Sequence, residues 1–322
     1  MANFPALSFP PRSTAGLRTP AVLVVVWLLF GSAFVGLKIG VAAVPPFLFS
    51  GSRFLAAGAI LLAWCAWRSG WRLELRPADV MAAGLVGLGL MGGGQGAASW
   101  AAQELSPGIL AVLITTVPLW VALLSWLFLH QRPPLPALAG IATGFLGVVF
   151  LASPSGGAGL RLVPALVVIG GAVSWAAASL YGSRTAISRR PLTATAIQLL
   201  AGGAVQVVAG LATGQAGAVH PADLVGPAGA AWLFLLLGPS LVGFPLFTWL
   251  MATTPPPVAN TNAYASPVVA IALAWLVLGQ PVGPRTLAAT AVILASVALI
   301  VSGAGRGSRR EEAAPVEERQ AA

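Results

Sequence analysis

The sequence has only one cysteine, Cys65, and this residue lies inside an apolar run. An intrachain disulfide, a zinc cluster of thiolates and a redox-active thiol pair are therefore excluded. Acidic residues are also scarce, with 8 Asp and Glu against 17 Lys and Arg, and none of the acidic residues falls inside a long apolar segment. The chain thus lacks the buried carboxylates from which proton relays are built inside membranes.

Motifs for enzymatic chemistry are missing as well. The sequence contains no phosphate-binding glycine loop, no metal-ligand cluster and no Ser/His/Asp set, so ATP-driven pumping by this chain alone is not expected. Its two histidines, His130 at the end of an apolar segment and His220 in a loop, are poorly placed for a proton relay. We therefore expect no catalytic residue, no metal and no cofactor.

The residues that are abundant are apolar. They make up 57% of the 322 residues, whereas charged residues make up 8%, and a water-soluble fold of this length does not normally have such a composition. The formal charge of +9 initially suggests a nucleic-acid partner. However, the basic residues occur singly or in small groups between apolar runs, which is typical of membrane topology. We expect the lipid bilayer, and not nucleic acid, as the main partner.

Membrane spans are predicted from segments of about 20 apolar residues, the length needed to cross the hydrocarbon layer as a helix. Ten segments meet this criterion or nearly do. They lie at about 21–41, 46–67, 79–101, 107–129, 135–152, 162–183, 191–213, 226–251, 256–278 and 284–303.

The distribution of basic residues predicts the orientation. With the amino terminus in the cytoplasm, most of the Lys and Arg fall in cytoplasmic segments, and the opposite side has only Arg161 and Arg285. Lys38 and Arg53 fall inside spans. We therefore expect a multi-pass protein of the inner (plasma) membrane with both termini in the cytoplasm.

The two halves of the sequence resemble each other. Pro46 corresponds to Pro191, Arg53 to Gln198, Trp100 to Trp249 and Pro118 to Pro267. Each half has five spans, an odd number, so the second half enters the membrane in the opposite orientation. Inverted repeats are typical of secondary transporters that work by alternating access.

The predicted organisation has four parts. They are a cytoplasmic amino-terminal tail at 1–20, a five-helix repeat at 21–152, a second five-helix repeat at 162–303 and a disordered cytoplasmic tail at 304–322. The fold class is accordingly an all-α membrane protein with ten transmembrane helices in two inverted five-helix repeats.

Short motifs recur in the same order in both halves. They are Phe30-Gly31-Ser32-Ala33-Phe34 with Lys38, Pro45-Pro46 with Arg53, Pro118-Leu119-Trp120, Ser174-Trp175-Ala176, Pro267-Val268-Val269 and Leu276-Val277-Leu278-Gly279-Gln280. With these motifs the chain resembles EamA-type members of the drug/metabolite transporter superfamily from about Ala21 to Ser302. The resemblance implies transport of metabolites, amino acids or drugs, often by export.

The chain departs from the family pattern at three positions. Phe30 stands where relatives often have Trp, and Gln131 and Gln280 stand where they have Glu at the ends of the fourth and ninth spans. The loss of both carboxylates argues against an ion-coupling role for these two positions here. Which ion drives transport, if any, stays open.

Two basic residues are the first candidates for a substrate site. Arg53 lies about 10 Å deep at 1.5 Å per residue, where a charged group is costly unless it meets a ligand, water or a partner. It either lines a cavity and binds an anion, or pairs with carbonyl groups or helix ends. Lys38 lies nearer a helix end, so its ammonium group either contacts substrate or extends to the interface.

The other cavity candidates are polar or aromatic residues inside spans. Asn260 and Tyr264 precede Pro267, where a break in the helix is expected, Thr115 precedes Pro118, and Gln95 shares one helix face with Ser99. Ser32 belongs to the first motif and Gln198 corresponds to Arg53. The aromatic candidates are Trp100, Trp120, Trp175 and Trp249. Each of these side chains either lines the cavity or packs helices together.

These observations favour a secondary transporter, most simply an exporter, of small organic metabolites, amino acids or drugs. The alternative is a membrane-embedded enzyme or a lipid-handling or structural membrane protein. An enzyme or lipid-handling protein would need a cluster of polar residues near one headgroup plane, and the sequence shows none.

Overall fold

The structure is a computed structural model of the whole chain. It describes residues 18–70, 73, 75–130, 135–152, 161–185, 191–254 and 261–313, and side chains for most of these. Within this part of the chain every regular element is a helix. The helices are α1 (Arg18–Val41), α2 (Pro46–Arg68), α3 (Pro77–Gly87), η1 (Leu88–Gln95), α4 (Gly96–Ala101), α5 (Pro107–Ile114), α6 (Val117–Leu129), α7 (Leu135–Ala152), α8 (Leu162–Ser183), α9 (Pro191–Ala212), η3 (Gln215–Ala218), η4 (Pro221–Leu224), α10 (Pro227–Leu235), η5 (Leu236–Gly243), α11 (Phe244–Thr253), α13 (Asn262–Leu278) and α14 (Pro284–Ala313).

Several of these helices are long and apolar enough to cross a membrane. In the described residues there are 7 of them, at Thr19–Val41, Pro46–Arg68, Pro77–Ala101, Pro107–Leu129, Leu162–Ser183, Pro191–Ala212 and Pro227–Phe247. Shorter apolar helices lie at Leu138–Gly147, Ala265–Leu278 and Pro284–Leu299. The predicted all-helical membrane fold is therefore confirmed. Many helices begin with proline in their first turn, because this position needs no backbone donor.

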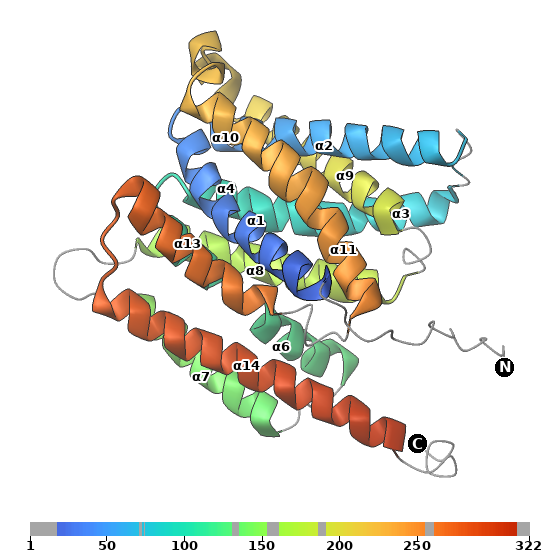
Figure 1. Cartoon of the computed structure of the whole chain (residues 1–322), viewed down its shortest axis with the longest axis vertical. Coiled ribbons are helices and arrows are strands. Elements are labelled where there is room, and N and C mark those ends of the chain that lie inside the picture. Colours follow the sequence, from blue (N-terminus) through green and yellow to red (C-terminus); the bar gives the residue numbers. More distant parts are fainter. Residues whose placement is uncertain are drawn as a thin grey trace.

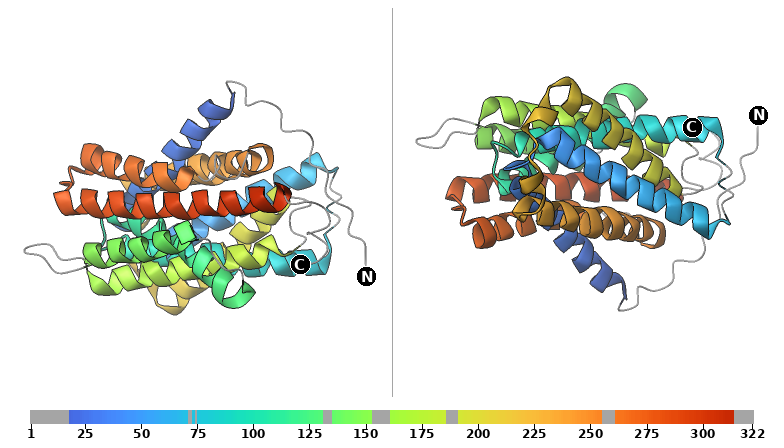
Figure 2. Two further views of the ribbon diagram at one scale, coloured as in Figure 1. Left: turned by 90° about the horizontal axis from the view of Figure 1, so that it is seen from below. Right: turned by 90° about the horizontal axis from the view of Figure 1, so that it is seen from above.

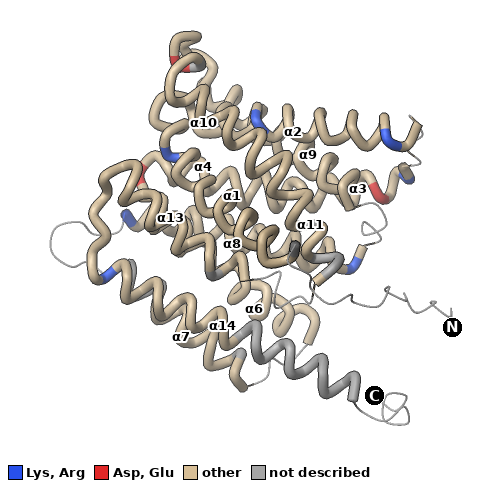
Figure 3. Tube along the Cα trace, in the orientation of Figure 1, with Lys and Arg blue, Asp and Glu red and all other residues tan. Residues whose placement is uncertain are grey.

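The helices run between two ends of the bundle (Figure 1). We call the end where α1 finishes and α2 begins the Lys38 face, and the end where α2 finishes and α3 begins the Arg68 face. The Lys and Arg residues of the described chain lie mostly near helix ends, which leaves the middle of the bundle almost free of charge (Figure 3).

The two halves of the chain interlock. Helix α2 packs along α9, α1 packs against α13 and α10, and α8 packs against η1 and α6. Helices α7 and α14 form a pair at one edge of the bundle (Figures 1 and 2). Every one of these pairs joins an element of the first half to an element of the second half, so the two halves share a common interface.

The buried core differs between the two faces. The largest cluster joins residues near the Lys38 face from eight segments of the chain, namely Leu37, Phe49, Ala98, Leu110, Ala165, Ala231, Ile271 and Ile293 with their neighbours. Toward the Arg68 face the described core is split into smaller clusters around Phe54 and Met91, around Leu119, and around Leu250. Among the described residues, the core is therefore continuous near the Lys38 face and separated into clusters toward the Arg68 face.

Glycines allow the close helix contacts. A Cβ atom added at Gly171 of α8 would lie 2.6 Å from Ala97 Cβ and 3.2 Å from Gly94 O, whereas a Cβ at Gly170 would meet nothing within 4 Å. We expect Gly171→Leu to destabilise the protein by about 1–3 kcal/mol or more through overpacking. Gly170→Leu is the matched control and should leave the thermal unfolding temperature of the purified protein nearly unchanged. Equal unfolding temperatures would contradict the packing of α8 on the third span.

The structure differs from the sequence-based expectations inside the helices. Helix α14 extends to Ala313 and so includes the first residues of the segment 304–322, where we expect a disordered tail. Helix α13 runs through Pro267 without a break, although we expected a break there. The third and eighth spans contain π-helical segments, η1 and η5, that the sequence did not predict.

Candidate functional site

Arg53 is buried in the middle of the bundle. Its side chain is 5% exposed, and its guanidinium carbon lies 4.1 Å from the centroid of the Phe54 ring. Among the described residues it has no hydrogen bond or ion pair, and its Nε atom is enclosed without a partner. The only described salt bridge joins Arg161 and Glu104 at the Lys38 face.

Polar contacts on either side of Arg53 hold α2 in place. Ser99 donates to Gln95 O at 2.8 Å, so the 2.6 Å contact between Ser50 and Ser99 has Ser50 as its donor. On the other side, Trp232 Nε1 donates to Ser52 Oγ at 3.0 Å. These bonds fix α2 against the third and eighth spans.

The π-helical segment η1 is held by side chains from the second half of the chain. Gln206 Nε2 on α9 donates to Met91 O at 2.7 Å, and Ser174 Oγ on α8 donates to Gly89 O at 3.0 Å. The Met91 carbonyl group also accepts from the backbone N–H of Gly96, so the bond from Gln206 is a second one. The two side chains tie η1 to α8 and α9. Gln206 is 2% exposed, and its Oε1 atom is enclosed without a partner.

A groove of about 560 Å³ runs beside η1 between α8 and α9. Its lining is mostly apolar and comes from α2, the third span, α8 and α9. The residues that line it are Phe47, Leu88, Gly92, Gly93, Gly96, Ala97, Trp100, Val167, Val205, Gln206 and Ala209. Of the residues predicted from the sequence, only Trp100 lines this groove.

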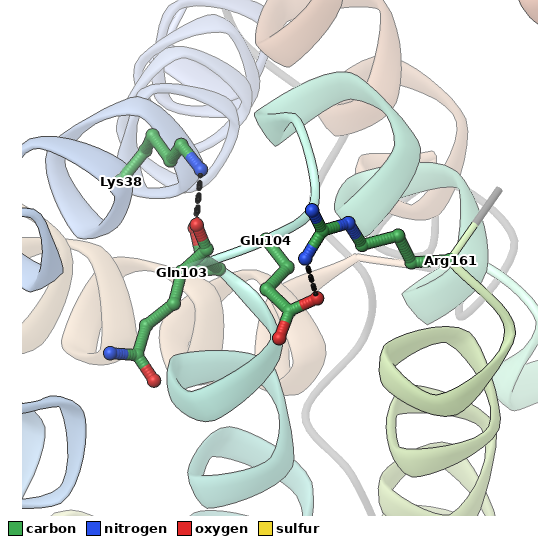
Figure 4. Close-up of polar contacts among 5 residues, drawn as sticks. Lys38, Gln103, Glu104 and Arg161 are labelled. Atoms are coloured by element: carbon green, nitrogen blue, oxygen red, sulfur yellow. Dashed lines mark hydrogen bonds and ion pairs between the residues drawn. The ribbon is translucent and has the colours of Figure 1, made fainter. Parts of the chain in front are cut away.

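Lys38 belongs to a cluster of polar contacts at the Lys38 face (Figure 4). Its ammonium group donates to Ala102 O at 2.8 Å and to Gln103 O at 2.9 Å, which caps the end of the third span. Beside it, Arg161 Nη1 donates to Glu104 Oε2 at 2.6 Å. The cluster joins α1 and the turn after α4 to the start of α8.

Several of the predicted residues make contacts within their own helix or with a neighbouring helix. The Thr115 hydroxyl donates to Ala111 O of its own helix, where the fourth span breaks between α5 and α6. The Ser32 hydroxyl likewise donates to carbonyl groups of α1. Trp120 packs edge-on against Phe145 of α7 with ring centroids 5.0 Å apart, and its Nε1 is enclosed without a partner.

The remaining predicted residues are spread over the bundle. Trp175 packs against Gly94 and beside the central cluster that contains Phe54. The backbone of Gln198 contacts Gly87, and Trp249 is 41% exposed.

Two predicted residues cannot be placed in the site. Asn260 lies outside the described residues, and Tyr264 belongs to α13 but its side chain lies outside the described part of the chain.

The structure adds residues that the sequence reasoning missed. Gln206 and Ser174 contact η1, and Ser240 in η5 has an enclosed hydroxyl without a partner. The run Gly92-Gly93-Gly94 was the available signal, because consecutive glycines weaken a regular helix. A polar residue inside a predicted span, such as Gln206, was a second signal.

Comparisons with known proteins agree with this architecture. A family model described as the EamA-like transporter family matches residues 19–153 and 162–302. The "Uncharacterized inner membrane transporter YedA" of Escherichia coli (strain K12) is 34% identical over 284 residues, covering 87% of this chain and 90% of that protein. The "Probable terminal-alkyne amino-acid exporter" of Streptantibioticus cattleyicolor is 26% identical over 300 residues, covering 91% and 96%. A solved crystal structure with 22% identity has a TM-score of 0.59 and covers 88% of this chain and 96% of its own, so it shares the fold.

Proposed function

This chain belongs to the EamA-like transporter family, and from that premise we propose that it exports a small organic solute by alternating access. The working unit is ten spans in two inverted five-helix repeats, with both termini in the cytoplasm and the protein in the inner membrane. Two matches of one family model, at residues 19–153 and 162–302, support the repeat. The name of the YedA relative supports the inner membrane.

The observation that carries the proposal is the difference between the two faces. Within the described chain, one continuous core cluster joins the helices near the Lys38 face, whereas the clusters toward the Arg68 face are separate. A carrier that works by alternating access needs a state that is closed at one face and can part at the other. With the orientation predicted from the basic residues, this state faces the cytoplasm and is ready to load a solute for export.

The Lys38 cluster supports the same mechanism. Its salt bridge joins Glu104 of the first half to Arg161 of the second half, with side chains that are 36% and 68% exposed. An exposed pair of this kind contributes only about 0.2–1 kcal/mol. Such a contact favours the closed face slightly and can break when that face opens.

The solute class follows from the family and from the lining of the bundle. Metabolites, amino acids and drugs are the classes that the family resemblance implies, and one relative is named an amino-acid exporter. The described spans offer aromatic and aliphatic side chains with few polar groups. We therefore propose a solute with a substantial apolar part. No cofactor takes part in this mechanism.

Counterflow in proteoliposomes tests the function whatever the identity of the solute. Vesicles are loaded with an isotope-labelled extract of water-soluble cell metabolites and diluted into buffer with or without the unlabelled extract. We expect a small set of labelled solutes to leave faster when the unlabelled extract is outside, because a carrier returns loaded more readily than empty. Mass spectrometry of the external medium measures this release.

Protein-free vesicles are the control for leakage. Release of every small solute at similar rates would indicate a pore, and release equal to that of protein-free vesicles would contradict transport.

A further inference from the structure

Arg53 is the one described basic side chain that is buried and has no hydrogen-bond or ion-pair partner in the described chain. Its guanidinium group has no hydrogen bond or ion pair within the described chain, and Nε is enclosed. An unpaired cation inside a protein costs free energy, so we expect a buried arginine to have a partner that offsets this cost. The ring of Phe54 at 4.1 Å compensates only in part, because it offers no hydrogen-bond acceptor.

The elements around Arg53 do not supply an acceptor. Helix α2 packs against α9, η5, α4, α1, α10 and η3. The acidic residues of the described chain lie toward the ends of the bundle, with Asp79 in the first turn of α3, Glu104 in the turn after α4, Asp223 in η4, and Glu311 and Glu312 at the end of α14. Among the described contacts, the hydroxyl oxygens of Ser50 and Ser52 bond to Ser99 and Trp232 and accept no hydrogen bond from Arg53. Within the described chain, no protein group therefore pairs with the charge of Arg53, and we look for its partner among bound ligands.

The geometry restricts what that partner is. Because Nε is enclosed, the two terminal Nη atoms are the donors left for a ligand. Two parallel N–H groups match the two oxygens of a carboxylate or of a phosphate. Only one positive charge is available, because the other cation inside a described span, Lys38, is bound to Ala102 O and Gln103 O. A single charge balances a carboxylate and leaves a dianionic phosphate half neutralised.

We propose that Arg53 binds the carboxylate of the transported solute end-on through its two Nη atoms, and so selects small monocarboxylates, amino acids included. This inference rests on the proposed transport function and adds the solute's charge to it. The apolar part of the solute packs on the partly buried side chains that flank the cluster of Phe54 and Met91, among them Leu90, Trp175 and Phe244.

Equilibrium dialysis tests the site separately from transport. The purified protein in detergent is dialysed against a defined mixture of the twenty amino acids, their carboxamides and simple aliphatic and aromatic monocarboxylic acids. Each acid and its carboxamide differ only in the charged group, so they form matched pairs. We expect carboxylates to be retained over their carboxamides, and retention to fall about ten- to hundredfold in Arg53→Gln, the effect of losing one or two charge-assisted hydrogen bonds. Arg53→Lys should keep part of the binding, because the charge remains but the paired geometry is lost.

A stability measurement separates a binding role from a structural one. If Arg53 serves a ligand, Arg53→Met removes an unpaired buried charge, and the ligand-free variant should unfold at a temperature equal to or above that of the wild type. A clear fall in the unfolding temperature of the ligand-free Arg53→Met protein would assign Arg53 to the packing of the bundle and overturn the proposal. Retention of no carboxylate, equal retention of the carboxamides, or unchanged retention by Arg53→Gln would overturn it as well.

The two experiments fail independently. If solute-selective counterflow is observed without carboxylate retention, the transport function is supported and the proposed role of Arg53 is contradicted. If carboxylates are retained through Arg53 but no counterflow is observed, the binding site is supported and the transport function is contradicted.

Discussion

Oxidation of a protein with the substitutions Gly108→Cys and Ile271→Cys is expected to stop counterflow, and reduction is expected to restore it. A Cβ atom added at Gly108 would lie 3.7 Å from Ile271 Cβ, within the range of about 3.5–4.5 Å that disulfides require. Gly108 is in α5 and Ile271 in α13, so the bond would tie the first half to the second inside the core cluster of the Lys38 face. A face that is tied shut cannot open to release a solute.

The crosslinking experiment uses a Cys65→Ala background, because Cys65 is the only other thiol. Each single-cysteine variant is the matched control and should show the same counterflow before and after oxidation. Peptide mass spectrometry without reduction measures the extent of the crosslink. Full counterflow by protein that is completely crosslinked would show that the Lys38 face need not part during transport, and it would remove alternating access at this face from the mechanism.

The positions of the helices were largely predictable from the sequence. The described helices begin at Pro46, Pro107, Leu162 and Pro284, where apolar runs begin after turn-forming residues. The signal is strong because a helix in lipid must be long and apolar, and because proline at the first turn marks the start. The all-helical fold follows from the same two facts, since an open sheet would leave backbone groups unpaired in lipid.

The internal irregularities of the helices were not predictable in the same way. Pro118 and Pro267 are equivalent in the two halves, yet the fourth span breaks before Pro118 and α13 continues through Pro267. The π-helical segments η1 and η5 occupy matching positions in the third and eighth spans. Whether a proline or glycine breaks a membrane helix depends on donors from neighbouring helices, and these belong to the tertiary structure.

The surroundings of the candidate residues were predictable only in part. The burial of Arg53 followed from its depth in a span, but its lack of a protein acceptor required the structure. Trp100 and Trp249 are equivalent by the repeat, and only Trp100 lines the groove whereas Trp249 is 41% exposed. A sequence repeat gives the two halves similar backbones. In a conformation that is closed at only one face, however, equivalent residues of the two halves have different surroundings. Equivalent residues therefore need not have equivalent roles in one conformation.

The second large effect is expected at η1. Ser174→Ala and Gln206→Leu together would remove both side-chain donors to the Gly89 and Met91 carbonyl groups. A hydrogen bond of this kind contributes about 0.5–1.5 kcal/mol, and the Met91 carbonyl group keeps the backbone N–H of Gly96 as a donor. The double variant should therefore lose about 1–3 kcal/mol of a total stability of about 5–15 kcal/mol. We expect the double variant to unfold at a clearly lower temperature, and its counterflow to fall, because η1 borders both the groove and the cluster of Phe54 and Met91.

The single variants should differ from each other in a specific way. Gln206→Leu also removes an enclosed Oε1 atom that has no partner, and this gain offsets part of the lost hydrogen bond, so its cost should be smaller than that of Ser174→Ala. Ser183→Ala on the same helix α8 is the matched control, because the Ser183 hydroxyl donates to Leu180 O of its own helix. Hydrogen exchange of the amides of residues 88–95 should rise in the double variant and stay unchanged in the control. If exchange in this segment were equal in all variants, the donors from α8 and α9 would not be what maintains the π-helical turn, and its origin would lie in the glycine run alone.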